Sequence, residues 1–282
     1  ASRTAAENRG ADFGALWGDD AIHYYVHGKD NIPFHTIILP ALLLGSGGGW
    51  HLPDRIVSSE YQTLEGRKIS TSQNYAIWVK DLLARYEADS IRYFFLANGP
   101  EKKDADFSWR EFVHSHNGEL LGGYGNFVNR SLAFIEKYLD GTVPEGKADP
   151  EIHRQIGELY ASVGRLIEKG SFKDALERIF DFVRSANKFF DARQPWIART
   201  ADRKACEDTL YQCVQIVGNL AVLLAPFLPF SSEKVCGWLG VTNRWEKQSV
   251  PAGHRLPEVE ILFRRIDKAA IEEETEKLKA IL

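Results

Sequence analysis

The segment from Gly66 to Ser72 gathers residue types that hold phosphate groups. It reads Gly-Arg-Lys-Ile-Ser-Thr-Ser and follows a stretch that we expect to be a strand. Gly66 gives the backbone freedom to turn, and Lys68 supplies a cation. The hydroxyl groups of Ser70, Thr71 and Ser72 can donate to phosphate oxygens, beside their own backbone N–H groups. An ordinary surface turn is the alternative interpretation of this segment taken alone.

The segment from Gly28 to His35 lies upstream, directly after the apolar run at 21–26. The pattern predicts a strand, a turn and then a helix that Pro33 opens, with Asp30 or Asn31 as its cap. Apolar residues at helical spacing continue this helix until Gly45. Ligands bind at the carboxyl ends of strands in an open α/β sheet, so this turn is a candidate binding site.

Three residues after Trp109 have side chains that can contact an unpaired base. A helix is expected to end at Pro195 and to leave the indole of Trp196 at a turn, where it can stack on a base. Asn126 and Arg130 stand four residues apart on a predicted helix and therefore share a face. Asn can read a base edge, and Arg can bond to a base or a phosphate. Taken alone, Trp196 also fits a core or capping residue.

Positive charge gathers around Trp196 although the net charge of the chain is −4. The stretch 184–204 holds six cations and two anions, which gives a local charge of +4. A patch of this size can guide a phosphate backbone to the surface, and its binding would be salt-sensitive. A solvated helix surface is the alternative. The cations are Arg184, Lys188, Arg193, Arg199, Arg203 and Lys204, and the anions are Asp191 and Asp202.

Two kinds of structure must position these residues. Before Trp109, short apolar runs such as 55–58 and 91–97 alternate with glycine-rich turns, which suits the end of an α/β domain and a small connecting module. After Trp109, a 3.6-residue periodicity dominates and predicts a helical bundle, with joints that include 141–150 and 199–203. The fold class is therefore α/β plus all-α. The expected helices are 112–138, 151–168, 172–190, 205–224 and 231–239.

The composition indicates a soluble cytoplasmic protein with no membrane segment. Hydrophobic residues make up 44% and charged residues 26% of the chain, and no apolar run is long enough to span a bilayer. The three cysteines form no Cys-x-x-Cys pair, so buried thiols are expected, and neither disulfides nor a zinc or other metal site. They are Cys206, Cys213 and Cys236.

Four segments together resemble the methionyl-tRNA synthetases, which are class I aminoacyl-tRNA synthetases. They are residues 28–35, the loop 68–72, the segment 104–109 and the segment 125–130, in matching order and spacing over nearly the whole chain. The resemblance implies the C-terminal part of a Rossmann-type catalytic domain with a connecting module at 1–108, followed by a helical anticodon-binding domain at 109–282. It also implies a methionine–tRNA ligase, which uses ATP and Mg²⁺ to make methionyl-adenylate and transfers the methionyl group to tRNA(Met).

The family opens its Rossmann fold with a His-Ile-Gly-His-type signature that this sequence lacks. The resemblance therefore implies a C-terminal half whose partner is the missing N-terminal half of the catalytic domain, and which is inactive alone. It implies catalysis by Lys68, Ser70 and Thr71. It assigns the ATP phosphates to Lys68, Ile69, Ser70, Thr71 and Ser72, the L-methionine pocket to Asn31, Phe34 and His35, and the CAU anticodon to Asn126, Arg130, Pro195 and Trp196.

Thr71 departs from the family loop, which usually reads Lys-Met-Ser-Lys-Ser. A threonine cannot neutralise the charge that develops on pyrophosphate, so Lys68 and Mg²⁺ would supply more of the stabilisation. The role of His35 stays open between orienting the substrate and bonding the local backbone, with the second favoured. Lys29 and Asp30 are not expected to act as general bases, because the reaction is a displacement between bound substrates.

Two other functions are compatible with parts of the pattern. Leucyl, isoleucyl, valyl and cysteinyl synthetases share a class I core and a helical anticodon domain, but the Gly-Asn-Phe segment joined to Gln-Pro-Trp favours the methionyl enzymes. A non-catalytic tRNA-binding module is the second alternative, and the missing nucleotide signature and Thr71 favour it.

Overall fold

The computed structural model describes residues 2–280, and the chain divides into two compact units. Unit 1 comprises Ala1–Gln62 and Pro100–Ala105, and unit 2 comprises Thr63–Gly99 and Asp106–Leu282. The part of the chain from 63 to 99 therefore groups with the helical bundle. The domain boundary expected between residues 108 and 109 stays a prediction. No helix within residues 2–280 is both long and apolar enough to cross a membrane.

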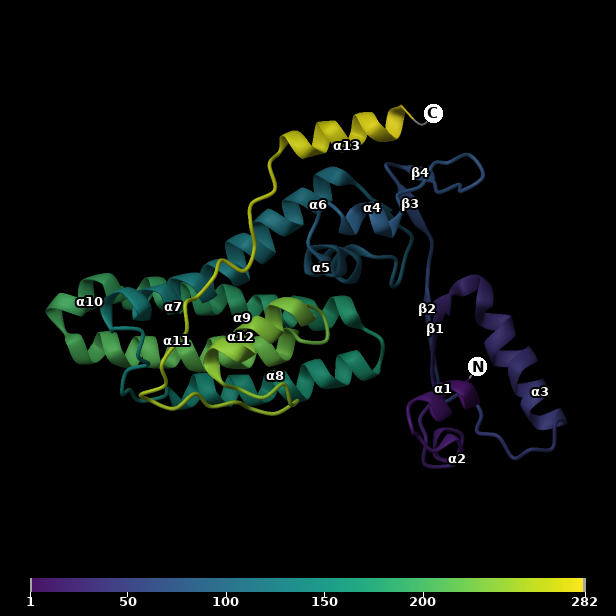
Figure 1. Ribbon diagram of the computed structural model, residues 1–282, viewed down its shortest axis with the longest axis horizontal. Coiled ribbons are helices and arrows are strands. Elements are labelled where there is room, and N and C mark those ends of the chain that lie inside the picture. The colour runs from purple at the N-terminus through teal and green to yellow at the C-terminus, as the bar shows by residue number, and fades with distance from the viewer. Residues whose placement is uncertain (1, 281–282) are drawn as a thin grey trace. The chain divides into compact units, whose positions relative to one another are not determined.

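Unit 1 is built around two parallel strands, β1 (Tyr24–Gly28) and β2 (Arg55–Ser59), which Figure 1 shows side by side. The register places Tyr24 opposite Arg55 and Gly28 opposite Ser59. The strand thus begins three residues later than the apolar run at 21–26 indicated. The helical elements are α1 (Ser2–Asn8), α2 (Phe13–Leu16), the 3-10 turn η1 (Lys29–Asn31), the π-helical turn η2 (Phe34–Ile38) and α3 (Leu39–Gly45).

The strand, turn and helix predicted around Pro33 are confirmed, but the predicted cap is wrong. Pro33 itself occupies the position before η2, and no side chain caps this helix start. The carboxylate of Asp30 instead accepts a hydrogen bond of 2.7 Å from the hydroxyl of Tyr61. Asn31 contributes its backbone carbonyl, which His35 contacts. Proline can open a helix without a cap because it has no N–H group to satisfy.

A small three-stranded sheet and two helices precede the bundle. The strands are β3 (Gln62–Leu64), β4 (Arg67–Lys68) and β5 (Ala105–Phe107), in the order β4-β3-β5, and the helices are α4 (Val79–Leu83) and α5 (Ala88–Asn98). The apolar run at 91–97 therefore belongs to a helix. Glu65 and Gly66 both have positive φ angles, 45° and 73°, and form the tight turn between β3 and β4. Two successive positive φ angles give a turn whose twist matches the right-handed twist of the two strands of a hairpin.

The bundle contains the helices that the periodicity predicts, with two differences. Its elements are α6 (Trp109–Ser115), η3 (His116–Gly125), α7 (Asn126–Tyr138), α8 (Pro150–Glu168), α9 (Phe172–Arg193), α10 (Pro195–Ala201), α11 (Arg203–Leu224), α12 (Pro229–Leu239) and α13 (Ala269–Lys279). The first difference is η3, a π-helical segment inside the helix expected at 112–138. The second is α10, which occupies part of the joint expected at 199–203. Within 199–203, Asp202 alone lies outside a helix, between the end of α10 and the start of α11, and its carboxylate caps α11.

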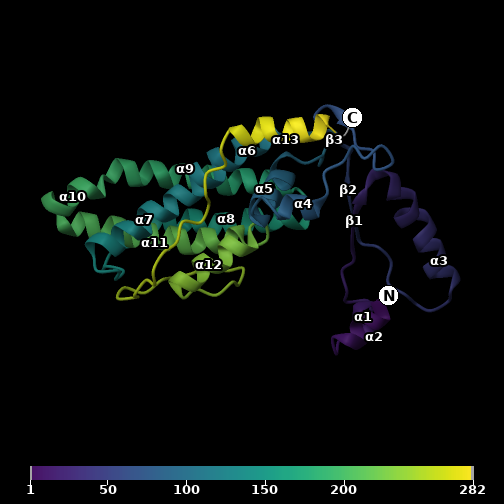
Figure 2. The same ribbon diagram turned by 45° about the horizontal axis from the view of Figure 1, so that its top comes forward.

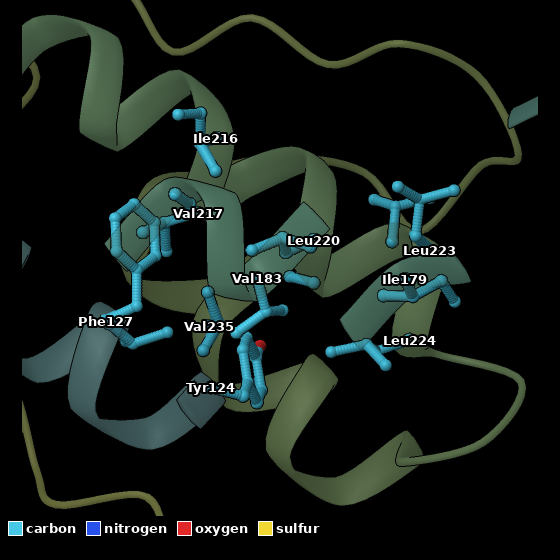
Figure 3. Packing of buried hydrophobic residues seen from close by; sticks show 14 of the residues in the cluster. Tyr124, Phe127, Ile179, Val183, Ile216, Val217, Leu220, Leu223, Leu224 and Val235 are labelled. Carbon is cyan, nitrogen blue, oxygen red and sulfur yellow. The ribbon is translucent and has the colours of Figure 1, made fainter. Parts of the chain in front are cut away.

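The core of the bundle surrounds α11, which is buried along most of its length because apolar residues occupy all of its faces. Figure 3 shows how Leu220 and Leu224 of α11 meet Val183 of α9 and Tyr124 of η3. The end of η3 leaves little room for a side chain at Gly125. A Cβ there would lie 3.0 Å from the carbonyl oxygen of Leu120 and 3.1 Å from the Phe263 ring. Asp149 and Pro150 start α8 as cap and first helical residue.

Helix α13 runs along α6, as Figures 1 and 2 both show. Its buried Leu278 packs in a second apolar cluster with Trp109 and Phe112 of α6. The buried Glu274 pairs with Arg85 and Lys277. The last described helix is therefore fixed to the module that carries the loop 68–72.

Candidate functional site

The loop 68–72 leaves β4 and is closed by a bridge between Ser70 and Tyr75. The N–H of Ser70 donates to the carbonyl of Tyr75 at 2.9 Å, and the N–H of Tyr75 donates to the carbonyl of Ser70 at 2.8 Å. Tyr75 is buried, and its hydroxyl donates to the carbonyl of Leu64 at 2.9 Å. The ring of Tyr75 therefore anchors the base of the loop, while Lys68 and Thr71 lie exposed.

The donors expected in this loop are only partly available to a ligand. The backbone N–H of Ser70 is used by the bridge, and its hydroxyl lies 3.2 Å from that of Ser72. Within residues 2–280, the backbone N–H groups of Thr71 and Ser72 meet no acceptor. Exposed donors that lack protein partners, next to a lysine, form a surface that can accept phosphate oxygens.

Acidic residues hold the hairpin in front of this loop. The carboxylate of Asp106 accepts hydrogen bonds from the hydroxyl of Thr63 at 2.6 Å and from the N–H of Gly66 at 2.9 Å. The carboxylate of Glu65 accepts from the N–H of Trp109 at 2.8 Å. These bonds fix the orientation of β4, at whose end Lys68 lies exposed.

In unit 1, His35 lies against β1 while Phe34 is 56% exposed. The ring of His35 stacks on that of His27, with 4.4 Å between centroids and 17° between planes, and its centroid is 5.3 Å from that of Tyr25. Its Nδ1 contacts the carbonyl of Asn31 at 2.9 Å. The local backbone contact favoured by the sequence is therefore present. Nε2 of His35 has no partner among the described residues, so it can still face a ligand.

Lys29 holds its positive charge in a network at the end of β1. Its ammonium pairs with Glu60, lies 3.8 Å from Asp104 and sits 4.2 Å from the centre of the Tyr61 ring. The hydrogen bond with Glu60 is the main cause that raises the pKa of Lys29 above its ordinary value. A lysine that stays charged cannot accept a proton.

At the other candidate site, α7 and α9 are joined by two polar contacts one turn apart. The side-chain amide of Asn126 donates to that of Asn187 at 3.2 Å. The guanidinium of Arg130 donates to Asp191 at 2.6 Å. The shared face of Asn126 and Arg130 is thus confirmed, and the side-chain oxygen of Asn126 is left to accept a hydrogen bond.

Trp196 joins this group from α10. Its indole is 43% exposed and lies 6.1 Å from the Phe190 ring, tilted by 36°. The guanidinium of Arg130 sits 4.4 Å from the centre of the Phe190 ring and 5.9 Å from that of Trp196. Trp196 is therefore neither a core nor a capping residue. It lies in the first turn of α10, whereas the sequence indicated a turn outside any helix.

Pro195 is buried and acts on the neighbouring backbone. It is the first residue of α10, directly after Gln194, which has the left-handed φ of 45° that ends α9. The carbonyl of Pro195 accepts a contact of 3.4 Å from the thiol of Cys206. Pro195 thus sets the direction in which Trp196 leaves the bundle.

The basic stretch carries less free charge than the sequence indicated. Half of its cations pair with carboxylates: Arg184 with Glu119 and Asp181, Arg203 with Glu207, and Lys204 with Asp208. All four of these carboxylates lie outside 184–204, so the local charge of +4 counted from the sequence did not include them. Lys188, Arg193 and Arg199 form no ion pair within residues 2–280.

No group of three or more His, Cys, Asp or Glu side chains in the described part of the chain could hold a metal ion. The three cysteines are free and buried, as expected. Burial raises the pKa of the Cys213 thiol to about 12.

Two family models match the chain in succession. Residues 1–132 match the class I (M) tRNA synthetases, and residues 149–282 match the anticodon-binding domain of tRNA ligases. A methionine–tRNA ligase of Bacillus cereus strain G9842 is 56% identical over 279 residues, which are 99% of this chain and 51% of that protein. A methionine–tRNA ligase 1 of Alkaliphilus oremlandii is 54% identical over 96% of this chain and 50% of its own length.

The chain belongs to the methionyl-tRNA synthetase family. The Mycobacterium tuberculosis methionyl-tRNA synthetase bound by methionyl-adenylate superimposes with a TM-score of 0.81 and 28% sequence identity. The match covers 89% of this chain and 51% of that protein. This chain spans about half the length of the curated relatives that it matches. The fold class expected from the sequence, α/β followed by an all-α bundle, is confirmed.

Sequence reasoning missed the residues that hold the family motifs in place. Asn187 and Phe190 position Asn126 and Arg130, and Tyr75 closes the loop. Asn187 and Asp191 stand four residues apart, as Asn126 and Arg130 do. This matching spacing on two predicted helices was a signal that could have suggested the pairing.

Proposed function

We propose that this chain is part of a methionine–tRNA ligase, an aminoacyl-tRNA synthetase of the cytoplasm, and supplies part of the active site and the anticodon-binding domain. The whole enzyme would activate L-methionine with ATP to methionyl-adenylate and pass the methionyl group to tRNA(Met). The grouping of Asn126, Arg130 and Trp196 at one end of the bundle carries this proposal. An exposed indole beside a guanidinium and an amide offers stacking and base-edge contacts together.

In this proposal the loop 68–72 binds the phosphates of ATP. Negative charge develops on the leaving pyrophosphate when the methionine carboxylate attacks the α-phosphate, and Lys68 would neutralise part of it. Ser70, Thr71, Ser72 and the backbone at Ile69 would add hydrogen bonds and shape. Mg²⁺ would arrive bound to the ATP phosphates, since the described residues offer no acidic cluster for it.

Unit 1 would contribute Asn31, Phe34 and His35 to the methionine pocket. Its surface supports a further partner, the N-terminal half of the catalytic domain. Parallel sheets are normally covered on both faces, yet large apolar side chains lie exposed on and around β1 and α3. They include Val26, Phe34, Ile37, Leu42 and Leu44.

The anticodon proposal is tested by binding of the chain to an RNA stem-loop with the CAU anticodon and to one with an altered anticodon, at two salt concentrations. We expect preference for CAU, and we expect Trp196→Ala to weaken CAU binding roughly tenfold or more, the effect of one lost stack. Trp245→Ala is the matched control, because this indole is 40% exposed and lies against Tyr160 elsewhere on the bundle. Equal binding to both stem-loops, fading with salt, would leave only phosphate attraction and refute the proposal.

A further inference from the structure

A second cation–aromatic stack lies beside the group of Asn126, Arg130 and Trp196. The guanidinium of Arg199 on α10 sits 4.1 Å from the centre of the Tyr138 ring at the end of α7. The Tyr138 ring is in turn 4.6 Å from that of Phe134. Residues 126, 130, 134 and 138 are spaced four apart, so these stacks belong to one face of α7.

Arg199 differs from Arg130 and Arg203 in what its N–H groups contact. Arg130 is committed to Asp191, and Arg203 to Glu207. Arg199 is exposed, and no carboxylate or carbonyl within residues 2–280 accepts a hydrogen bond from it. Its guanidinium is thus held over a ring while its N–H groups remain available. A guanidinium in this state can stack on a base and bond to a phosphate at once.

The spacing also suits a nucleic-acid strand. Trp196 and Arg199 are three residues apart on α10, which makes them neighbours on one surface. The exposed Ile197 lies between them in the sequence. Two stacking positions in a row on one short helix can take two successive unpaired bases.

We propose that Arg199, held by Tyr138, forms a second base-stacking position, and that an unpaired base next to the anticodon occupies it when tRNA(Met) binds. This inference rests on the proposed function, because it needs the anticodon loop at Trp196. In this inference Arg199 contacts the base, and Tyr138 holds Arg199 in position.

The test places the fluorescent base 2-aminopurine either within the anticodon or directly 3′ of it in a stem-loop that is otherwise unchanged. Stacking quenches this base. We expect Arg199→Ala to remove the quenching at the 3′ position and to weaken binding roughly fivefold or more, which is the low end for one lost stack. Trp196→Ala should act on the anticodon position instead. Arg199→Lys keeps the charge without the plane, so it should restore the salt dependence but not the quenching.

Arg193→Ala is the matched control. Arg193 is also a cation over an aromatic ring, 5.4 Å from the centre of Phe189, but this ring belongs to the same helix, α9. The Arg193→Ala substitution should reduce the slope of log affinity against log salt concentration by about one, without changing the quenching of 2-aminopurine at either position. Thermal unfolding of each variant reports whether the Tyr138 contact is needed for folding.

Two outcomes overturn the inference. One is an equal loss of binding affinity in Arg199→Ala and Arg193→Ala while the 2-aminopurine stays quenched, which would show that Arg199 acts only as a surface charge. The other is full recovery by Arg199→Lys. If the wild-type chain shows no preference for CAU, the proposed function itself fails, and this is seen before any Arg199 variant is measured.

Discussion

The ion pair of Glu274 should make a large and local contribution to stability. The Glu274 side chain is 5% exposed, and its carboxylate contacts Arg85, the ammonium of Lys277 at 3.1 Å and the hydroxyl of Tyr86 at 3.4 Å. Glu274→Ala would leave the Arg85 guanidinium without this partner beside the rings of Tyr86 and Trp109. Breaking a fully buried pair in this way costs about 3–5 kcal/mol.

The expected loss is smaller than that limit because one partner reaches water. The Arg85 side chain is 33% exposed, so its guanidinium can be partly solvated after the substitution. We therefore expect Glu274→Ala to lower the free energy of unfolding by about 1.5–3 kcal/mol. Urea unfolding followed by tryptophan fluorescence measures it, since the buried Trp109 lies next to the pair. Hydrogen exchange along 269–279 would show whether α13 detaches first.

Glu276→Ala is the matched control for this measurement. Glu276 lies on the same helix, its side chain is 70% exposed, and it pairs with Lys279 at 2.8 Å. Such an exposed pair is worth about 0.5 kcal/mol or less. A double-mutant cycle with Arg85→Ala should give a coupling of about 1 kcal/mol or more. Equal losses in the two glutamate variants, or strict additivity in the cycle, would refute the idea that the buried carboxylate fixes α13.

Three further predictions concern catalysis, pH and thiol chemistry. In the whole protein, Lys68→Ala should slow ATP–pyrophosphate exchange at least about tenfold, and Thr71→Lys should raise its rate. Each substitution would change the positive charge that faces the leaving pyrophosphate in the proposed mechanism. An unchanged rate in Lys68→Ala would show that the loop has no part in this step. Burial lowers the pKa of His116 below 6.5, so the unfolded chain binds this proton first, and the free energy of unfolding should fall as pH drops below about 6.5. His116→Gln should flatten that slope in urea titrations, and a slope that persists would assign it to other groups. A thiol reagent should label the native chain slowly, because its cysteines are buried, and should label the unfolded chain at three sites. These sites are Cys206, Cys213 and Cys236. Fast labelling of the native chain would contradict this burial.

Features that depend on spacing along one helix could be predicted from the sequence. The four-residue spacing of Asn126 and Arg130 placed them on one face before any helix was observed, because this spacing is close to one helical turn. The long helices α8, α9 and α11 followed from the same periodicity. Local chemistry also indicated an exposed loop with Lys68.

Features that depend on packing between elements could not be predicted in the same way. Asn187 becomes a partner of Asn126 only when α9 lies against α7. The bridge between Ser70 and Tyr75 forms because the buried Tyr75 reaches the carbonyl of Leu64. The helix cap expected at Asp30 was wrong for a related reason, since Tyr61, thirty-one residues away, takes that carboxylate.

The π-helical segment η3 sets the angle of the α7 face that carries Asn126 and Arg130. Each residue added to an α-helix turns everything after it by about 100°. The wider turns of η3, from His116 to Gly125, therefore decide the azimuth at which α7 starts at Asn126. Losing one residue from this glycine-rich segment would rotate Asn126 and Arg130 away from α9 while leaving both residues in the chain. A homologue that keeps Asn126 and Arg130 but differs in the length of η3 should thus present these two side chains in another direction.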